Sequence, residues 1–176
     1  MTSDIYLRRA WEILIKEGIE QINMDLLAEK IGTTKRTIYN HFESREDFFQ
    51  CLIDYQIDAL KDSTLPLFSI SDINSKDILK QWLVYNIDFN KILKSKLLSS
   101  LHQYDILTYN YFTASLRQYY TEFLALLIPR GRRENLFIDG FNTDSFANFV
   151  FSIIIHNPID DYIPFIVRSI SKEEKV

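Results

Sequence analysis

Apolar residues recur every three or four positions along most of this 176-residue chain, and few helix-breaking residues interrupt them. The sequence holds four glycines and four prolines, well below the usual share of roughly 12% for the two together. Sandwiches, barrels and doubly wound sheets need more turn residues than this. The hydrophobic share of 47% and the charged share of 25% are those of a folded protein. The sequence therefore predicts an all-α fold of about nine helices.

Several classes of protein are disfavoured by what the sequence lacks. Cys51 is the single cysteine, so an internal disulfide is excluded and a reducing cytoplasm is expected. The first residues do not resemble a signal peptide, and the longest apolar runs are too short to span a bilayer. We therefore expect a cytoplasmic protein with no membrane partner.

Catalytic and metal-binding patterns are also missing from the sequence. It has no Gly-rich phosphate loop, no GxSxG and no HExxH. His102 and His156 have acidic neighbours, but neither has a second His or Cys at ligand spacing. We expect no metal, no cofactor and no enzymatic activity.

The first part of the chain reads as short helices with clear end signals. Gly18 and Gly32 follow apolar stripes, where a left-handed residue ends a helix. Asn23, Thr34 and Ser44 stand where their side chains can cap the next helices. A compact group of short helices is therefore expected here.

Longer helices are expected in the rest of the chain. Residues 65–75 are predicted to form a loop, and the helices beyond it lengthen. One long helix is predicted to end at Pro129 and Gly131. We therefore expect two domains, a small one of residues 1–50 and a larger helical one of residues 51–176.

Residues 24–43 carry the most specific pattern. Ala28, Gly32 and Ile38 have the relative spacing of a helix-turn-helix. The small Ala28 lets the paired helices approach closely, and Gly32 supplies the positive φ of the sharp turn. Ile38 is expected to seat the following helix on the core, so that the opposite face of this helix projects outward.

The predicted outward face is polar and basic, and consists of Thr33, Thr34, Lys35, Arg36, Thr37, Asn40 and His41. Arg and Lys suit guanine edges or phosphates, Asn suits adenine, and Thr suits phosphates or the thymine methyl group. The whole chain has a net charge of −4. Residues 33–45, however, hold three basic side chains against one acidic. This patch is therefore locally cationic and fits the DNA major groove.

The sequence around this patch resembles a known family. The most specific residues are the run Ile38-Tyr39-x-x-Phe42, followed by Ser44, a basic residue and Glu46. Together with the helix-turn-helix glycine and alanine, they are similar to the N-terminal domain of TetR-family transcriptional regulators. The resemblance covers roughly residues 5–52.

The resemblance implies a DNA-binding regulator, most simply a bacterial repressor found at the nucleoid when bound to its operator. The implied DNA-contacting residues are Asn23, Thr33, Thr34, Lys35, Arg36, Thr37, Tyr39, Asn40, His41 and Arg45. One small helix-turn-helix offers few base contacts, so two copies on a palindromic operator in double-stranded DNA are expected.

The family also implies a homodimer built through a four-helix bundle of the last two helices. The residues expected at that interface are Phe146, Phe149, Val150, Ile153, Ile163, Ile166 and Ile170. Burial within one chain would produce the same apolar pattern.

A small-molecule effector that releases the operator is a further expectation from the family. Aromatic residues that could line its pocket are Trp82, Tyr85, Phe89, Tyr104, Phe112, Tyr119 and Phe123. An aromatic stripe at helical spacing also fits an ordinary core.

Two other functions remain compatible with the sequence. One is a protein of the same fold that has lost DNA binding and acts as a protein-interaction adaptor or co-activator. The other is a small-molecule-binding or catalytic protein whose work lies in residues 75–170.

Overall fold

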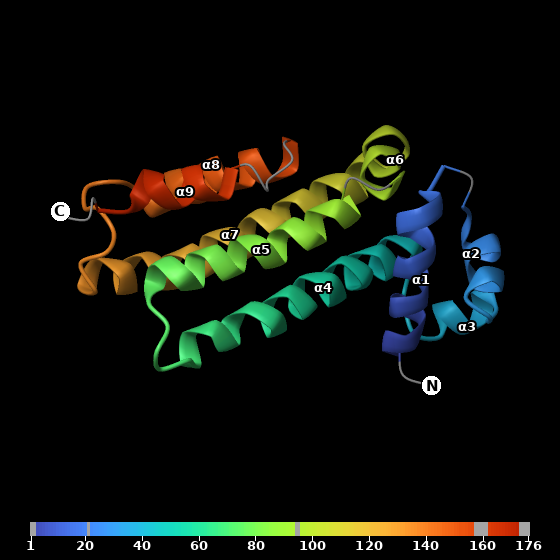
Figure 1. Cartoon of the computed structure of the whole chain (residues 1–176). Helices are drawn as coiled ribbons and strands as arrows, with labels where there is room; N and C mark the ends of the chain where they lie inside the picture. Colours follow the sequence, from blue (N-terminus) through green and yellow to red (C-terminus); the bar gives the residue numbers. More distant parts are fainter. Residues whose placement is uncertain (1–2, 21, 94–95, 157–161, 173–176) are drawn as a thin grey trace. The chain divides into compact units, whose positions relative to one another are not determined.

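The computed structural model describes residues 3–20, 22–93, 96–156 and 162–172. These residues form nine α-helices, one 3₁₀-helix and an isolated bridge between Phe137 and Ser171, with no β-strand among them (Figure 1). The helices are α1 (Ser3–Glu17), α2 (Met24–Lys30), α3 (Lys35–Tyr39), α4 (Arg45–Thr64), α5 (Ser75–Leu93), α6 (Lys96–Tyr104), α7 (Ile106–Arg133), α8 (Thr143–His156) and α9 (Ile163–Ile170), and the 3₁₀-helix is η1 (Leu65–Ser69). The predicted all-α fold is confirmed.

The chain divides into two compact units. The first unit comprises Met1–Ala59 and Lys91–Ser115, and the second comprises Leu60–Asn90 and Leu116–Val176. The boundaries fall within α4, α5 and α7, so the N-terminal helices share a unit with α6. The expected division of function between residues 1–50 and 51–176 stays a prediction.

In the first unit, the end of α1 rests closely on α6. Gly18 follows α1 with φ +74°, the left-handed value predicted for it. The Ser100 hydroxyl accepts a hydrogen bond from the Ile19 N–H at 2.9 Å and donates one to the Leu97 carbonyl at 2.9 Å. A Cβ at position 18 would lie 2.8 Å from Ser100 Oγ and 3.2 Å from the Lys96 carbonyl oxygen. Glycine is therefore required here both for its φ and for its size.

The core of the second unit is built from aromatic residues of α5 and α7. The rings of Trp82 and Phe123 stack with centroids 4.8 Å apart, and the Trp82 indole N–H donates to the Tyr119 hydroxyl at 2.8 Å. The Thr64 hydroxyl lies 2.9 Å from the same Tyr119 oxygen. Each of these side chains is buried, so they form a packed core with an internal polar link.

Two expected helix boundaries are wrong. Residues 65–69 form η1 instead of a loop, with Pro66 in its first turn. The long helix α7 passes through Pro129 and ends at Arg133. Its end is made by Asn135, which has φ +57°, and by the Leu136 N–H, which donates to the Gly131 carbonyl at 2.9 Å.

Gly131 has a packing role instead of a terminating one. A Cβ at this position would lie 2.1 Å from the Phe137 ring. The residue is glycine because the chain folds back over it after the helix ends. Its place near the helix end suggested a cap from sequence alone.

The close approach of α6 to Gly18 gives a first prediction, with Gly32 as a matched control. Gly32 has φ +80°, and its nearest Cβ neighbour would be Arg9 Nη1 at 3.5 Å. Gly32→Ala should therefore destabilise by the left-handed backbone strain alone, about 1–2 kcal/mol. Gly18→Ala adds overpacking against Ser100 and should cost at least about 1 kcal/mol more. Urea denaturation followed by circular dichroism measures the difference. Equal losses in the two variants would contradict the close packing of α6.

Candidate nucleic-acid interface

The helix-turn-helix is assembled by local caps and by two small or apolar contacts. The Asn23 side chain accepts hydrogen bonds from the Asp25 and Leu26 N–H groups at 3.1 and 2.9 Å and caps α2. Ala28 is 1% exposed and Ile38 is fully buried. The pairing of α2 with α3 inferred from the sequence is therefore present in the structure.

The helix α3 is short and is stabilised at its first turn by Thr34. The Thr34 hydroxyl oxygen accepts a hydrogen bond from the Thr37 N–H at 3.1 Å, and the two hydroxyls lie 2.9 Å apart. The turn before it is closed by a hydrogen bond from the Thr33 N–H to the Ala28 carbonyl at 2.9 Å. These hydrogen bonds fix the orientation of α3, whose outer face lies in solvent.

The side chains predicted to contact DNA lie on the outer side of this arrangement. Exposed residues of the set are Asn23, Thr34, Lys35, Arg36, Tyr39, Asn40 and His41, and half-buried ones are Thr33, Thr37 and Arg45. None is buried, whereas the neighbouring Ile38 and Phe42 are. Alternation between buried apolar and exposed polar positions thus gives α3 one free face.

His41 is oriented by aromatic neighbours. Its ring centroid lies 5.5 Å from that of Tyr6 on α1 and 6.4 Å from that of Phe42. Phe42 in turn meets Phe48 edge-on with centroids 5.0 Å apart. Phe42 is therefore part of the core, and His41 is held at the border between this core and the free face.

Lys35 carries its charge beside a carboxylate. Its Nζ lies 2.9 Å from Asp25 Oδ2, and this hydrogen bond and the charge of Asp25 raise the pKa of the Lys35 ammonium above its ordinary value. Both side chains are largely exposed, so the pair is screened by water and contributes little to stability. A phosphate can replace such a partner readily.

Arg45 begins α4 and is fixed on two sides. The Ser44 hydroxyl caps the helix by accepting from the Asp47 N–H at 3.0 Å. The Arg45 guanidinium carbon lies 4.6 Å from the centroid of Phe49, and Nη1 lies 2.7 Å from Asp105 Oδ2. The residue is thus ordered before any DNA is present. The spacing of the sequence gave no signal for Asp105, which lies 60 positions away.

The residues predicted to line an effector pocket are spread over both units. Trp82, Tyr119 and Phe123 belong to the aromatic core of the second unit, and Phe89 is also buried. Tyr85 and Tyr104 are exposed, and the Tyr104 hydroxyl donates to Glu20 Oε1 at 2.9 Å.

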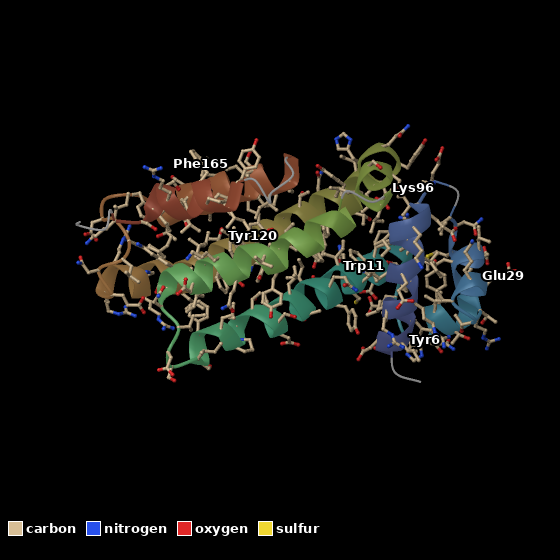
Figure 2. The ribbon with its side chains drawn as sticks, in the orientation of Figure 1. Tyr6, Trp11, Glu29, Lys96, Tyr120 and Phe165 are labelled. Atoms are coloured by element: carbon tan, nitrogen blue, oxygen red, sulfur yellow. The ribbon has the colours of Figure 1, made fainter. Side chains whose placement is uncertain are left out.

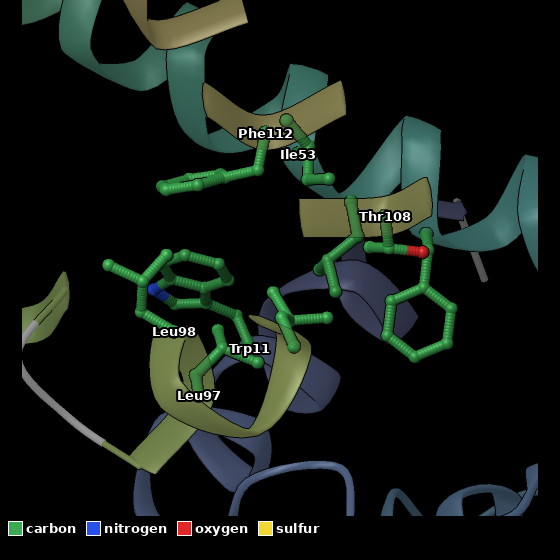
Figure 3. A pocket seen from close by; sticks show the side chains of 9 residues that line it. Trp11, Ile53, Leu97, Leu98, Thr108 and Phe112 are labelled. Atoms are coloured by element: carbon green, nitrogen blue, oxygen red, sulfur yellow. The ribbon is translucent and has the colours of Figure 1, made fainter. Parts of the chain in front are cut away.

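In the first unit, Phe112 lines a small apolar cavity between α1, α4, α6 and α7 (Figure 3). Trp11 and Leu98 face it from α1 and α6, and its lining side chains carry two polar groups, the Thr108 hydroxyl and the Trp11 indole N–H. Its volume of about 10 Å³ is that of a single water-sized sphere. An ordinary metabolite would need these side chains to move.

In the second unit, Tyr119 and Phe123 form part of an open groove of about 240 Å³. Leu65 and Leu126 form its apolar walls, and the salt bridge between Lys61 and Glu122, 3.1 Å long, borders it. This groove is large enough for a small molecule without rearrangement.

The predicted dimer residues divide into buried and accessible ones. Phe146, Val150, Ile166 and Ile170 are buried within the chain itself, Ile153 and Ile163 are half-buried, and Phe149 is 39% exposed. Phe165 on α9 was missed by the sequence analysis and is 59% exposed (Figure 2). Its ring lies 6.4 Å from that of Phe149 on α8. The accessible apolar surface of α8 and α9 therefore centres on these two phenylalanines.

Comparison with known proteins agrees with this geometry. Residues 7–52 match the family model described as bacterial regulatory proteins, tetR family. An uncharacterized HTH-type transcriptional regulator of Bacillus subtilis, YvaF, is 25% identical over 65% of this chain, and the chain spans 60% of that protein's length.

Solved structures extend the likeness to the whole fold. The reduced form of NemR from E. coli matches with a TM-score of 0.79 and 12% identity, over 99% of this chain and 100% of that one. A transcriptional regulator from Saccharomonospora viridis, solved in complex with choline, matches with a TM-score of 0.71 and 15% identity, over 97% of this chain and 98% of that one. Residues 7–52 are thus similar to the TetR family, and the fold of the chain is that of these solved structures.

The family model and the relatives that are described by function are regulatory proteins rather than enzymes. Among the described residues there is no cluster of three or more potential metal ligands. No helix within the described ranges combines the length and apolar character needed to cross a membrane.

The cap of α3 gives a prediction about the stability of this helix. Thr34→Ala removes the acceptor for the Thr37 N–H and should destabilise the protein by about 1 kcal/mol. Thr34→Ser keeps the acceptor and should stay within about 0.5 kcal/mol of the wild type. Thermal unfolding compares the two variants. Equal stability of Thr34→Ala and the wild type would show that the cap does not hold α3.

Proposed function

We propose that this protein binds a palindromic operator as a homodimer, represses transcription, and is released by a small-molecule effector. In this proposal residues 1–50 contact DNA and residues 51–176 dimerise and bind the effector. The match of residues 7–52 to the TetR family supports the proposal as a whole. The observation that carries the DNA-binding part is the free polar face of α3, since its helix is anchored by Ile38 and its exposed positions are those predicted for DNA contact.

The chemistry of the free face supports a double-stranded DNA partner. Arg36 near the start of α3 and Asn40 just after its end are both exposed, and their side chains suit base edges. Lys35 and Arg45 supply positive charge for phosphates, and Tyr39 and Asn23 add hydrogen-bonding groups at the border. The ten candidate residues are proposed together as the DNA contact.

A dimer is proposed because one five-residue helix can read only a few base pairs. The pair of exposed phenylalanines on α8 and α9, Phe149 and Phe165, supports an apolar contact with a second copy. A large exposed aromatic pair of this kind is unfavourable in water unless it is covered. The half-buried Ile153 and Ile163 lie on the same two helices and extend this proposed interface.

Effector release is proposed on more general grounds. A solved structural neighbour holds choline, so the fold accommodates small ligands. The groove between α4, η1 and α7 in the second unit offers about 240 Å³ with aromatic floor residues Tyr119 and Phe123. An effector of mixed apolar and polar character fits this lining, because charged Lys61 and Glu122 border the apolar part.

The DNA-binding proposal predicts a strong effect of removing the two basic residues at the start of α3. Lys35→Ala combined with Arg36→Ala should weaken operator binding at least about tenfold, because contacts of this kind are each worth about 1–3 kcal/mol. The measurement is a gel shift at low salt with genomic fragments that flank the gene for this protein.

The control is Lys61→Ala, which removes one positive charge from the second unit, where Lys61 pairs with Glu122. It should leave the shift unchanged. No specific shift by the wild-type protein, with or without added metabolites, would refute the regulator. Partner binding that survives the double variant would instead favour the adaptor.

The dimer proposal predicts that Phe165→Asp converts the protein to a monomer. A charge placed in an apolar interface is unfavourable, because it loses its water on association. Sedimentation velocity measures the oligomeric state, and operator binding should weaken in parallel. Leu107→Asp is the control, since Leu107 is 75% exposed on α7 in the first unit. A dimer that survives Phe165→Asp but not Leu107→Asp would place the interface elsewhere.

A further inference from the structure

Two basic residues of the proposed DNA-binding face are paired with carboxylates, but the two pairs differ in how they are held. Lys35 and Asp25 are both well exposed, with 46% and 69% of their side-chain surface accessible. Arg45 and Asp105 are less exposed, at 33% and 11%. An exposed pair exchanges partners easily, whereas a partly buried one is more persistent. Of the two cations, Arg45 is therefore the one whose ability to bind a phosphate depends on its carboxylate partner.

Asp105 is fixed by three hydrogen bonds besides its salt bridge. Its Oδ1 accepts from the Thr108 N–H at 3.1 Å. Its own N–H donates to the Leu101 carbonyl at 2.8 Å, and its carbonyl accepts from the Tyr109 N–H at 3.0 Å. The residue thus ends α6 and caps α7 at once. The carboxylate position is set by the junction of these two helices.

The Asp105 carboxylate is also held in its ionised form. Partial burial raises the pKa of Asp105, but the hydrogen bonds from the Thr108 N–H and from Arg45 outweigh it and hold the pKa below its ordinary value. Asp105 is therefore an anion at neutral pH. Its neighbour Arg45 has Phe49 beneath the guanidinium plane, so the cation is confined between an aromatic ring and a fixed carboxylate.

A DNA phosphate at this guanidinium would meet the carboxylate that already occupies it. The bridge uses a terminal nitrogen, Nη1, with a separation of 2.7 Å from the carboxylate oxygen. A phosphate bound to the same planar group would lie within a few ångströms of Asp105. Two anions at that distance repel each other, and only one cation is shared between them. The two therefore compete for Arg45.

We infer that Asp105 masks Arg45, so that this arginine contacts the DNA backbone only when its bridge to the α6–α7 junction opens. This inference rests on the proposed DNA binding and adds a means of controlling it. While the α6–α7 junction keeps its present geometry, the affinity of the protein for DNA of any sequence would be lower. A change at the junction would release one further phosphate contact in each protomer.

The test is a double-mutant cycle on the full-length protein. Asp105→Asn removes the charge but keeps an oxygen for the Thr108 N–H, so α7 stays capped. Arg45→Gln removes the cation. The probe is a fluorescently labelled 30-base-pair duplex of arbitrary sequence, and anisotropy gives affinity at several salt concentrations. Asp54→Asn is the control for a general charge effect, because Asp54 in the same unit accepts from the Tyr111 hydroxyl at 2.9 Å.

If Asp105 masks Arg45, Asp105→Asn should bind the duplex more tightly than the wild type. The slope of log affinity against log salt concentration should be steeper by about 0.9 for each protomer, as expected for one added phosphate contact. The gain should vanish in the Arg45→Gln background, and Asp54→Asn should show little of it. Circular dichroism checks folding. Asp105→Ser, which also caps a helix, repeats the measurement if Asp105→Asn is unfolded.

Other outcomes overturn the inference. Weaker binding by Asp105→Asn would mean that the carboxylate positions Arg45 for DNA instead of masking it. The same gain in the Arg45→Gln background, or in Asp54→Asn, would reduce the effect to overall charge. Either result leaves the proposed DNA binding standing. Absence of binding by the wild type and by Asp105→Asn at low salt would overturn the DNA-binding proposal and the mask together.

Discussion

The proposed DNA-binding face depends on the burial of Ile38. The helix α3 has five residues, far too few to persist in water through its own hydrogen bonds. Ile38 anchors one side of it, the Thr34 hydroxyl closes its first turn, and the turn at Gly32 sets its direction. When these three interactions are made, the remaining side chains of the helix lie toward solvent. The face of α3 that is free to contact DNA therefore results from the way the opposite face of the helix is anchored.

The features that the sequence predicted correctly are those set by residues close together in the chain. Asn23, Thr34 and Ser44 cap helices within three positions of themselves, and their hydrogen bonds are present as expected. Gly18 and Gly32 have the positive φ that their places after apolar stripes suggested. The helix-turn-helix was therefore accessible from local chemistry, because its caps and turns form without help from distant residues.

The features that the sequence did not predict depend on distant contacts. Pro129 reads as a helix end, but α7 continues past it until Asn135 adopts a left-handed conformation. Apolar spacing alone cannot tell which face of α9 the chain itself covers, so it did not distinguish buried Ile166 from exposed Phe165. The pairing of Asp105 with Arg45 arises only when α6 and α7 fold against α4. No periodicity encodes it.

The proposed homodimer requires that two copies of α3 contact DNA on one face of the duplex. Hydroxyl-radical footprinting of the wild-type protein on the fragment that it binds tests this claim most directly. Two protected segments are expected, whose centres lie one helical turn apart, about 10–10.5 base pairs, or a whole multiple of that spacing. A single protected segment, or none at protein concentrations that saturate the fragment, would contradict it.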